Sequence, residues 1–94
     1  MGKWLHSGLR RDVRVVVASL GRPTDRACKT ALESHYGERV TPKTFHGALS
    51  ALVDAGHLVR ETDGIQDRYA LTPAGEQSLR AHHDWAQECL AESE

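Results

Sequence analysis

Apolar residues recur at helical spacing in four segments of this chain, and turn-forming residues separate the segments. The first stripe comprises Leu9, Val13, Val16, Val17 and Leu20. It predicts a helix with one inward face, with Ser7 as its cap and Gly21 to Pro23 at its end. A second helix is expected to begin at a Thr24 cap, to run to His35 and to stop at Gly37. Its inward residues are expected to be Ala27, Ala31 and Leu32.

Residues 41–55 and 72–90 form the third and fourth predicted helices, and both open with a Thr-Pro pair. A threonine hydroxyl at the cap satisfies a free backbone amide, and proline suits the first helical position because no donor is needed there. Two short strands, 57–61 and 68–71, lie between these helices. They flank the pair Asp63-Gly64, which is typical of a hairpin turn.

The order of these elements predicts a fold class. Three helices followed by a hairpin indicate a winged helix-turn-helix, an α+β fold that is mostly helical and has a two-stranded wing. Ninety-four residues supply one modest core and no separate ligand-binding domain. We therefore expect a single domain with its core over residues 8–71 and a C-terminal dimerisation helix over residues 72–90.

The third helix has one apolar and one polar face. At about 100° per residue, the inner face comprises Phe45, Ala48, Leu49, Leu52 and Val53. The opposite face comprises Lys43, Gly47, Ser50 and Asp54, flanked by Thr44, His46 and Ala51. A slim exposed side lets a helix enter the major groove of DNA, where donors and acceptors read the base edges. Because glycine in mid-helix costs about 1 kcal/mol relative to alanine, Gly47 either allows close approach by another surface or relieves packing inside the chain.

The charges are divided unevenly along a chain whose net charge is −1. Residues 1–50 carry nine Lys and Arg against four Asp and Glu, whereas residues 51–94 carry three against nine. This asymmetry predicts a basic working surface joined to an acidic remainder. The alternative is that both halves only present solvated faces.

Residues 41–75 carry the motifs of a known family. They read Thr-Pro-Lys-Thr-Phe-His-Gly-Ala-Leu-Ser-Ala-Leu-Val-Asp-Ala-Gly-His-Leu-Val-Arg and, after a short turn, Arg-Tyr-Ala-Leu-Thr-Pro-Ala-Gly. The aromatic residue, the Leu-x-x-Leu pair, the Gly-Leu-Val-type strand and the closing Tyr-x-Leu-Thr-x-x-Gly segment resemble PadR-type winged-helix regulators. MarR-like and ArsR-like regulators share much of this pattern. The matching positions are Phe45, Leu49, Leu52, Gly56, Leu58, Val59, Tyr69, Leu71, Thr72 and Gly75.

The resemblance implies binding of double-stranded DNA through the third helix and the wing, with dimerisation through a C-terminal helix. A sequence-specific transcriptional regulator is thus expected, with the recognition helix 41–55 in the major groove and the wing 60–68 at the backbone. The expected DNA contacts are Arg22, Arg26, Lys29, Thr41, Lys43, Thr44, His46, Gly47, Ser50, Arg60, Gln66 and Arg68. The C-terminal segment is shorter than the multi-helix arm of many PadR proteins, so effector pockets of larger members are not carried over.

The predicted wing is acidic for a surface that meets phosphate. Glu61, Asp63 and Asp67 accompany Arg60 and Arg68 there, so repulsion partly cancels attraction. The two arginines either contact the DNA backbone or pair with neighbouring acids across the hairpin. The acidic wing and the near-zero net charge favour a second hypothesis, a winged-helix protein-interaction module of a larger transcription or repair assembly.

The last helix carries a mainly apolar stripe with little core left to cover. The stripe comprises Gly75, Leu79, His82, His83, Ala86, Cys89 and Leu90, with Trp85 beside it. We expect a second copy of the chain to cover this stripe, with Trp4 packing nearby. Two-fold symmetry would also place two recognition helices in successive major grooves.

No cofactor, metal site or catalytic group is expected. His82, His83 and Cys89 lie near one helical side, but adjacent histidines point about 100° apart, and no Cys-x-x-Cys or His-x-x-x-His spacing occurs. Cys28 and Cys89 are expected to be reduced thiols in a cytoplasmic protein, a thiol switch being the alternative. The chain shows no phosphate loop or nucleophile elbow, no secretory signal over residues 1–7 and no membrane-spanning apolar run. These features argue against an enzyme and a membrane protein.

Overall fold

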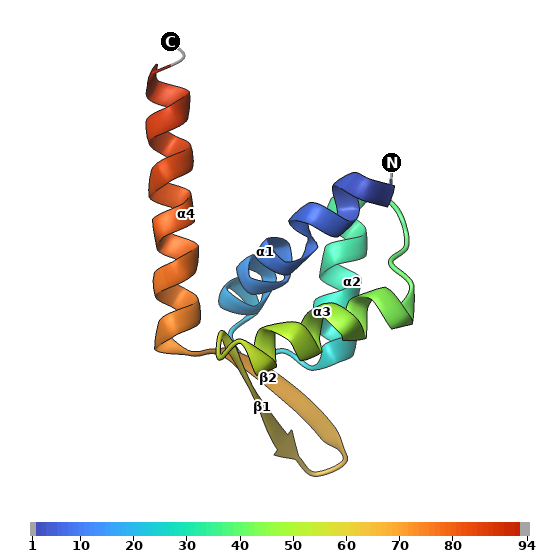
Figure 1. Cartoon of the computed structure of the whole chain (residues 1–94). Helices are drawn as coiled ribbons and strands as arrows, with labels where there is room; N and C mark the ends of the chain where they lie inside the picture. The colour runs from blue at the N-terminus through green and yellow to red at the C-terminus, as the bar shows by residue number, and fades with distance from the viewer. Residues whose placement is uncertain (1, 93–94) are drawn as a thin grey trace.

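A computed structural model describes residues 2–92, except for the side chains of residues 2–7 and 63. The elements are α1 (Gly2–Leu20), α2 (Asp25–Tyr36), α3 (Pro42–Asp54), β1 (Leu58–Asp63), β2 (Gln66–Leu71) and α4 (Pro73–Glu92). Figure 1 shows α1, α2 and α3 packed together, the hairpin projecting from the end of α3, and α4 standing apart from this bundle. The predicted fold class, a mostly helical winged helix-turn-helix with a C-terminal helix, is confirmed.

The hydrophobic core lies between the first three helices and the base of the hairpin. Its buried members are Leu9, Val13, Val17, Cys28, Leu32, Val40, Phe45, Ala48, Leu49, Leu52, Leu58 and Tyr69. The predicted inner face of α3 is confirmed, because four of its residues are in this set and Val53 packs against it. Among the described residues, α4 adds only Gly75 to the buried set.

The helix α1 begins earlier than predicted, ends before Gly21 as predicted, and leaves one residue of its predicted apolar stripe exposed. It begins at Gly2, so Ser7 lies within the helix and the prediction of Ser7 as its cap is wrong. The backbone is free to remain helical there because no proline interrupts residues 2–20. At the other end Leu20 is 49% exposed, since it is the last residue of the helix and lies beyond the packed stripe.

The helix α2 has the predicted caps but a different inner face. Thr24 accepts a hydrogen bond from the amide of Ala27, and Gly37 ends the helix with φ 71°, a conformation that glycine adopts without strain. The inward prediction for Ala27 is wrong, because it is exposed while Cys28 is buried. Cys28 and Leu32 are four residues apart, so both point to the side that faces the core.

The wing is a tighter hairpin than predicted. Its antiparallel strands pair from Leu58 opposite Leu71 to Asp63 opposite Gln66. The turn therefore centres on Gly64 and Ile65, not on the predicted Asp63-Gly64 pair. Gly64 has φ 67°, which suits the first central position of a type II′ turn. The extra cross-strand pairs explain the difference, because longer strands satisfy more backbone donors and acceptors than a wide loop does.

The helix α4 starts at the predicted cap but runs two residues further than predicted, to Glu92. The Thr72 hydroxyl accepts a hydrogen bond from the Gly75 amide at 3.0 Å. Beyond its first turns, α4 extends away from the bundle (Figure 1). Trp85 and Leu90 are consequently 59% and 68% exposed.

Candidate nucleic-acid interface

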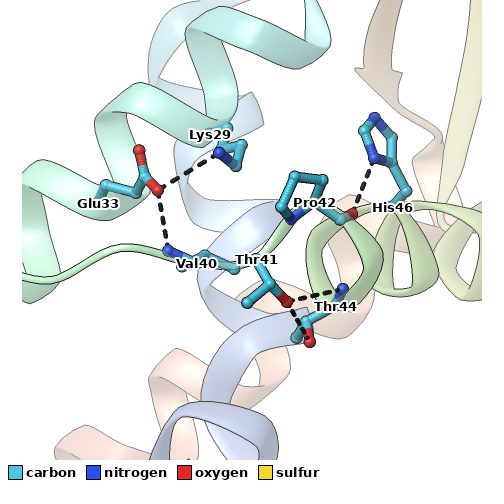
Figure 2. Close-up of polar contacts among 7 residues, drawn as sticks. All are labelled: Lys29, Glu33, Val40, Thr41, Pro42, Thr44 and His46. Atoms are coloured by element: carbon cyan, nitrogen blue, oxygen red, sulfur yellow. Dashed lines mark hydrogen bonds and ion pairs between the residues drawn. The ribbon is translucent and has the colours of Figure 1, made fainter.

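Two polar clusters fix the turn between α2 and α3, and Figure 2 shows both. The Thr41 hydroxyl caps α3 by accepting from the Thr44 amide at 3.3 Å, and it donates to the Thr44 hydroxyl at 2.9 Å. On the α2 side, the Glu33 carboxylate accepts from the Val40 amide at 2.8 Å and lies 3.4 Å from the Lys29 ammonium group. Side chains from α2 and α3 thus position the start of α3.

The Val40 contact also keeps Glu33 ionised. The hydrogen bond from the Val40 amide, with help from Lys29, holds the pKa of Glu33 below its ordinary value, although partial burial acts in the opposite direction. Glu33 is therefore charged at neutral pH and remains paired with Lys29. This leaves Lys29, one of the predicted phosphate contacts, partly neutralised within the chain.

The outer face of α3 is open to solvent as predicted. Its exposed residues are Lys43, His46, Gly47, Ser50 and Asp54, with Thr44 and Ala51 half-buried. A Cβ atom added at Gly47 would meet no atom of the described residues within 4 Å. Packing inside this chain therefore gives no reason for glycine at this position. Close approach by another molecule, the other explanation, stays a prediction.

Arg10 joins this face from α1, and the sequence analysis missed it. A hollow of about 350 Å³ is lined by Arg10 and Leu9 of α1 together with Lys43, Thr44 and Gly47 of α3. Arg10 is exposed, so it adds a cation at the edge of the polar face. No local signal identifies this residue, because only the packing of α1 against α3 brings positions 10 and 43 together.

His46 links the first turn of α3 to the start of α2. Its Nδ1 atom lies 2.9 Å from the Pro42 carbonyl oxygen, a contact drawn in Figure 2, and its Nε2 atom lies 3.4 Å from the Asp25 carboxylate. Because a carbonyl oxygen only accepts, Nδ1 carries the hydrogen of the shorter bond. The His46 side chain is 55% exposed, so its Nε2 atom is accessible to a partner that approaches α3.

The wing is tied to the linker between α1 and α2. The Tyr69 amide donates to the Pro23 carbonyl oxygen at 3.0 Å, and the Arg68 guanidinium donates to the Arg22 carbonyl oxygen at 2.8 Å. The Arg22 guanidinium in turn forms an ion pair with Glu61 of β1. Arg22 and Arg68, two of the predicted DNA contacts, therefore lie together at the junction of the wing and the linker.

The remaining predicted contacts, Arg26, Arg60 and Gln66, are exposed. Arg60 lines a small hollow with Ser50 and Asp54 of α3, so the wing adjoins α3 there. Across residues 2–92 we find no ion-pair partner for Arg60 within 4.0 Å. Pairing across the hairpin therefore does not engage this arginine.

The predicted stripe on α4 is largely uncovered. His83, Trp85, Cys89 and Leu90 are exposed, and Leu79, His82 and Ala86 are half-buried. The rings of His82 and Trp85 pack against each other, with centroids 5.6 Å apart. The prediction for Trp4 concerns a side chain outside the described part of the structure. Most of the rest of the predicted dimer surface is thus exposed to solvent in the single chain.

The structure offers little for metal or thiol chemistry. No group of three His, Cys, Asp or Glu side chains among the described residues could hold a metal ion. Burial, with a smaller effect of Asp25, raises the pKa of Cys28 to about 11, whereas Cys89 is exposed. Of the helices described, none is long and apolar enough to cross a membrane.

Three solved structures show what the fold is similar to. RosR of H. salinarum has a TM-score of 0.78 and 26% identity over 84% of this chain and 72% of its own. F93 from STIV, a winged-helix DNA-binding protein, has a TM-score of 0.71 and 14% identity over 85% and 87%. A PadR family transcriptional regulator from Eggerthella lenta has a TM-score of 0.67 and 23% identity over 97% and 88%. No protein-family profile and no curated protein sequence matches this chain.

These neighbours confirm the predicted resemblance to winged-helix transcriptional regulators, the PadR type included. At their low identities, F93 and the PadR regulator are informative about the fold alone. Since one fold supports many activities, the function of this chain has to be argued from the surface that α3, the linker and the wing present.

Proposed function

We propose that this chain is a sequence-specific transcriptional regulator that binds double-stranded DNA as a homodimer and has no catalytic activity of its own. The recognition helix, residues 41–55, enters the major groove, and the wing, residues 60–68, lies against the phosphate backbone. In this proposal residues 8–71 form the DNA-binding core and residues 72–90 join the two copies.

The outer face of α3 is the observation that carries the proposal. It is exposed, it is slim around Gly47, and it presents hydrogen-bonding groups on Lys43, His46 and Ser50. A helix in the major groove needs this combination, because bulky side chains would hold it away from the base edges. Cations near this face, on Arg10 and at the wing junction, suit the phosphates on either side of the groove.

The uncovered stripe of α4 supports the homodimer. Trp85 and Leu90 are exposed by more than half, and aromatic and large apolar side chains of this kind are typical of the centre of protein interfaces. A two-fold axis along this stripe would pair two recognition helices, which suits a palindromic operator.

Selection of bound sequences from a random duplex library tests the proposal most directly. We expect enrichment of a palindromic site, because each copy in a two-fold dimer meets the same half-site. The spacing of the half-sites then reports the distance between the two α3 helices. Failure to enrich any sequence with the full-length chain would contradict specific DNA binding.

Substitutions on α3 test which face meets DNA. Ser50→Glu is expected to abolish binding, because it places a carboxylate in a phosphate-lined groove, and Gly47→Glu should block entry of the helix. Lys43→Ala should weaken binding by about 1–3 kcal/mol if Lys43 contacts a base. Gln77→Glu, at an exposed α4 position on the face opposite the apolar stripe, is the control of equal added charge.

Melting temperature and duplex affinity are measured side by side for each variant. All four proteins should melt close to the wild type, because the substituted side chains are exposed. Folded Ser50→Glu and Gly47→Glu proteins that still bind the selected site with unchanged affinity would show that α3 does not enter the groove.

A protein-interaction module remains the second candidate, and the ion pair between Arg22 and Glu61 favours it. An arginine neutralised within the chain has less attraction for phosphate. The salt dependence of duplex binding separates the two candidates. A regulator that contacts phosphates loses affinity as salt rises, with the logarithmic slope falling by about one unit for each contact removed. Binding that ignores salt would favour the protein-interaction module.

A further inference from the structure

The helix α4 meets the rest of the chain mainly at its base. A cleft of about 560 Å³ opens between α1 and α4, with Val15 and Ala18 on one side and Leu79 and His83 on the other. Figure 1 shows the C-terminal part of α4 far from the three-helix bundle. The angle at which α4 leaves the bundle therefore depends on contacts made in its first two turns.

The first turn of α4 is pressed against the backbone between α3 and β1. A Cβ atom at Gly75 would lie 2.1 Å from the His57 carbonyl oxygen, whereas an ordinary contact is 3.4 Å or more. The same oxygen accepts the Thr72 amide hydrogen at 3.1 Å, and the Thr72 hydroxyl donates to the Gly56 carbonyl oxygen. A side chain at position 75 would have to push α4 more than an ångström away from this turn.

Arg14 of α1 holds the same junction from another side. Its Nη1 atom donates to the Ser78 hydroxyl of α4 at 3.0 Å and lies 3.2 Å from Nδ1 of His57. Because a guanidinium group only donates, His57 accepts through Nδ1 and carries its hydrogen on Nε2. One side chain thus contacts α4 and the turn after α3 at once.

Arg14 is held there without a counter-charge. Among the described residues no carboxylate lies within ion-pairing distance of it, and its Nε atom is buried without a hydrogen-bond partner. Arg14 is half-buried, and partial loss of water around a cation is unfavourable unless hydrogen bonds compensate for it. The two contacts that Arg14 makes supply this compensation, and both bear on the position of α4 relative to the end of α3.

We infer that Arg14, His57, Gly75 and Ser78 form an elbow that sets the distance between the two recognition helices of the dimer. The elbow residues do not contact bases; they act as positioning residues that select the spacing between half-sites. The inference rests on the proposed function, because only a DNA-bound dimer has such a spacing. A small change at the base is magnified along α4, since a helix of 20 residues is about 30 Å long.

The distance between the two wings of the free dimer tests the elbow without DNA. Ile65, at the tip of the wing, is fully exposed, so a spin label on Ile65→Cys disturbs no packing. Cys89→Ser removes the exposed native thiol, and Cys28 is buried and does not compete for the label. Because Cys89 lies on the predicted dimer stripe, light scattering first checks that this parent protein dimerises as the wild type does. Two variants are compared in this background: Gly75→Ala, which forces the elbow open, and Ser78→Ala, which removes one acceptor of Arg14 without adding bulk.

We expect one narrow inter-label distance for the parent protein. Gly75→Ala should move that distance by about 3 Å or more, because a displacement of over an ångström at the base is magnified along α4, and Ser78→Ala should broaden it. Ser34→Ala, an exposed serine of α2, is the matched control and should change nothing. Distances that stay unchanged in both elbow variants would overturn the inference, and Ser78→Ala keeps the test valid if Gly75→Ala does not fold.

A second readout uses the selection from a duplex library. The elbow variants should enrich the same half-site sequence as the wild type but with altered or relaxed spacing, which loss of stability alone would not produce. An unchanged spacing, or a changed half-site sequence, would contradict the positioning role. A labelled parent protein that shows no inter-label distance is a monomer, and this result rejects the homodimer itself and the elbow with it. A measurable distance in the parent protein with unaltered variants rejects the elbow alone.

Discussion

The helices α3 and α4 open with the same Thr-Pro pair, and in each the threonine hydroxyl accepts a hydrogen bond from the amide three residues later. Their surroundings are nevertheless different. In its 13 residues α3 buries four side chains, whereas in its 20 described residues α4 buries only Gly75. Cap chemistry is local and starts a helix wherever the chain carries it, but burial depends on what the fold places beside that helix.

The exposed faces of the two helices differ as well. On α3 the exposed residues are short or polar, and Gly47 leaves a gap in the side-chain surface. On α4 they include Trp85 and Leu90, whose apolar area remains in contact with water. A slim polar face suits a groove lined by hydrogen-bonding groups, whereas an apolar face gains most from a second protein surface. The comparison therefore supports the proposal that α3 meets DNA and that α4 meets a second copy of the chain.

The largest expected effect comes from the buried side of α3. Phe45→Ala should lower the free energy of unfolding by about 3–5 kcal/mol, because it removes a fully buried aromatic ring and leaves a cavity. Leu90→Ala on α4 should change it by less than about 0.5 kcal/mol in dilute protein. Urea unfolding at low protein concentration measures both, and comparable losses would show that α4 is part of the monomer core.

The two cysteines also lie in different regions: Cys28 is buried in the core, and Cys89 is exposed on α4. Burial, and secondarily Asp25, raises the pKa of Cys28 to about 11 from an ordinary 9.0, so at pH 8 its thiolate is about a hundredfold scarcer than that of an ordinary thiol. A thiolate of higher pKa is also the stronger nucleophile, which offsets part of this scarcity, but Cys28 is buried as well. Cys28 should therefore react with a thiol reagent at least about tenfold more slowly than the exposed Cys89 in dilute protein. The rates are measured separately in Cys89→Ser and Cys28→Ala proteins, and similar rates would contradict the burial of Cys28.

The raised pKa of Cys28 also has a consequence for stability. Below pH 9.0, the ordinary value of its pKa, the thiol is protonated in both folded and unfolded chains and its contribution is fully present. Between that pH and about 11, the unfolded chain loses the proton first, so the free energy of unfolding should fall as pH rises. The alkaline part of a melting-temperature profile measures this, and the decline should become shallower in Cys28→Ala. It does not vanish, because burial and the bond to Asp12 raise the pKa of Tyr36 above its ordinary 10.0 and add a decline of their own above that pH.

A charge placed beside the exposed stripe of α4 tests whether this surface joins the two copies of the homodimer. Trp85→Asp should raise the dissociation constant of the homodimer by about thirtyfold or more, a loss of about 2 kcal/mol, as expected for an aromatic residue at the centre of an interface. The melting temperature of dilute protein should stay unchanged, because Trp85 is exposed in the single chain. Light scattering over a concentration series measures the dissociation constant. A dimer that persists after truncation before Pro73 would contradict the role of α4.

Features that depend on neighbouring positions could be predicted from the sequence. The caps at Thr24 and Thr41, the end of α2 at Gly37 and the inner face of α3 are confirmed, since each follows from a few consecutive residues or one helical period. The outer face of α3 is its complement and is confirmed for the same reason. Whether those exposed residues meet DNA stays a prediction, because nothing in the single chain contacts them.

Features that depend on distant positions could not be predicted. Arg14 lies 43 residues from His57 and 64 from Ser78, so no pattern within one segment reveals their junction. Arg10 is found near α3 only because α1 packs there. The turn of the wing was misplaced by one residue for a related reason, since strand length is decided by pairing across the hairpin and not by the Asp-Gly signal alone.

The smallest expected effect is the difference in stability lost when the Thr41 cap of α3 or the Thr72 cap of α4 is removed. Thr41→Ala should cost about 1 kcal/mol of stability, the usual value for a lost threonine cap. Thr72→Ala should cost about 0.5–1 kcal/mol more, because the Thr72 hydroxyl donates to the Gly56 carbonyl oxygen outside its own helix, whereas the Thr41 hydroxyl donates only to Thr44 within the first turn of α3. Thr→Ser at each position keeps the hydroxyl and should restore most of the stability, which urea unfolding of the four proteins measures. Equal losses at both positions would show that the base of α4 is held no more firmly than the start of α3, and the bond from Thr72 to Gly56 would then contribute nothing to the attachment of α4.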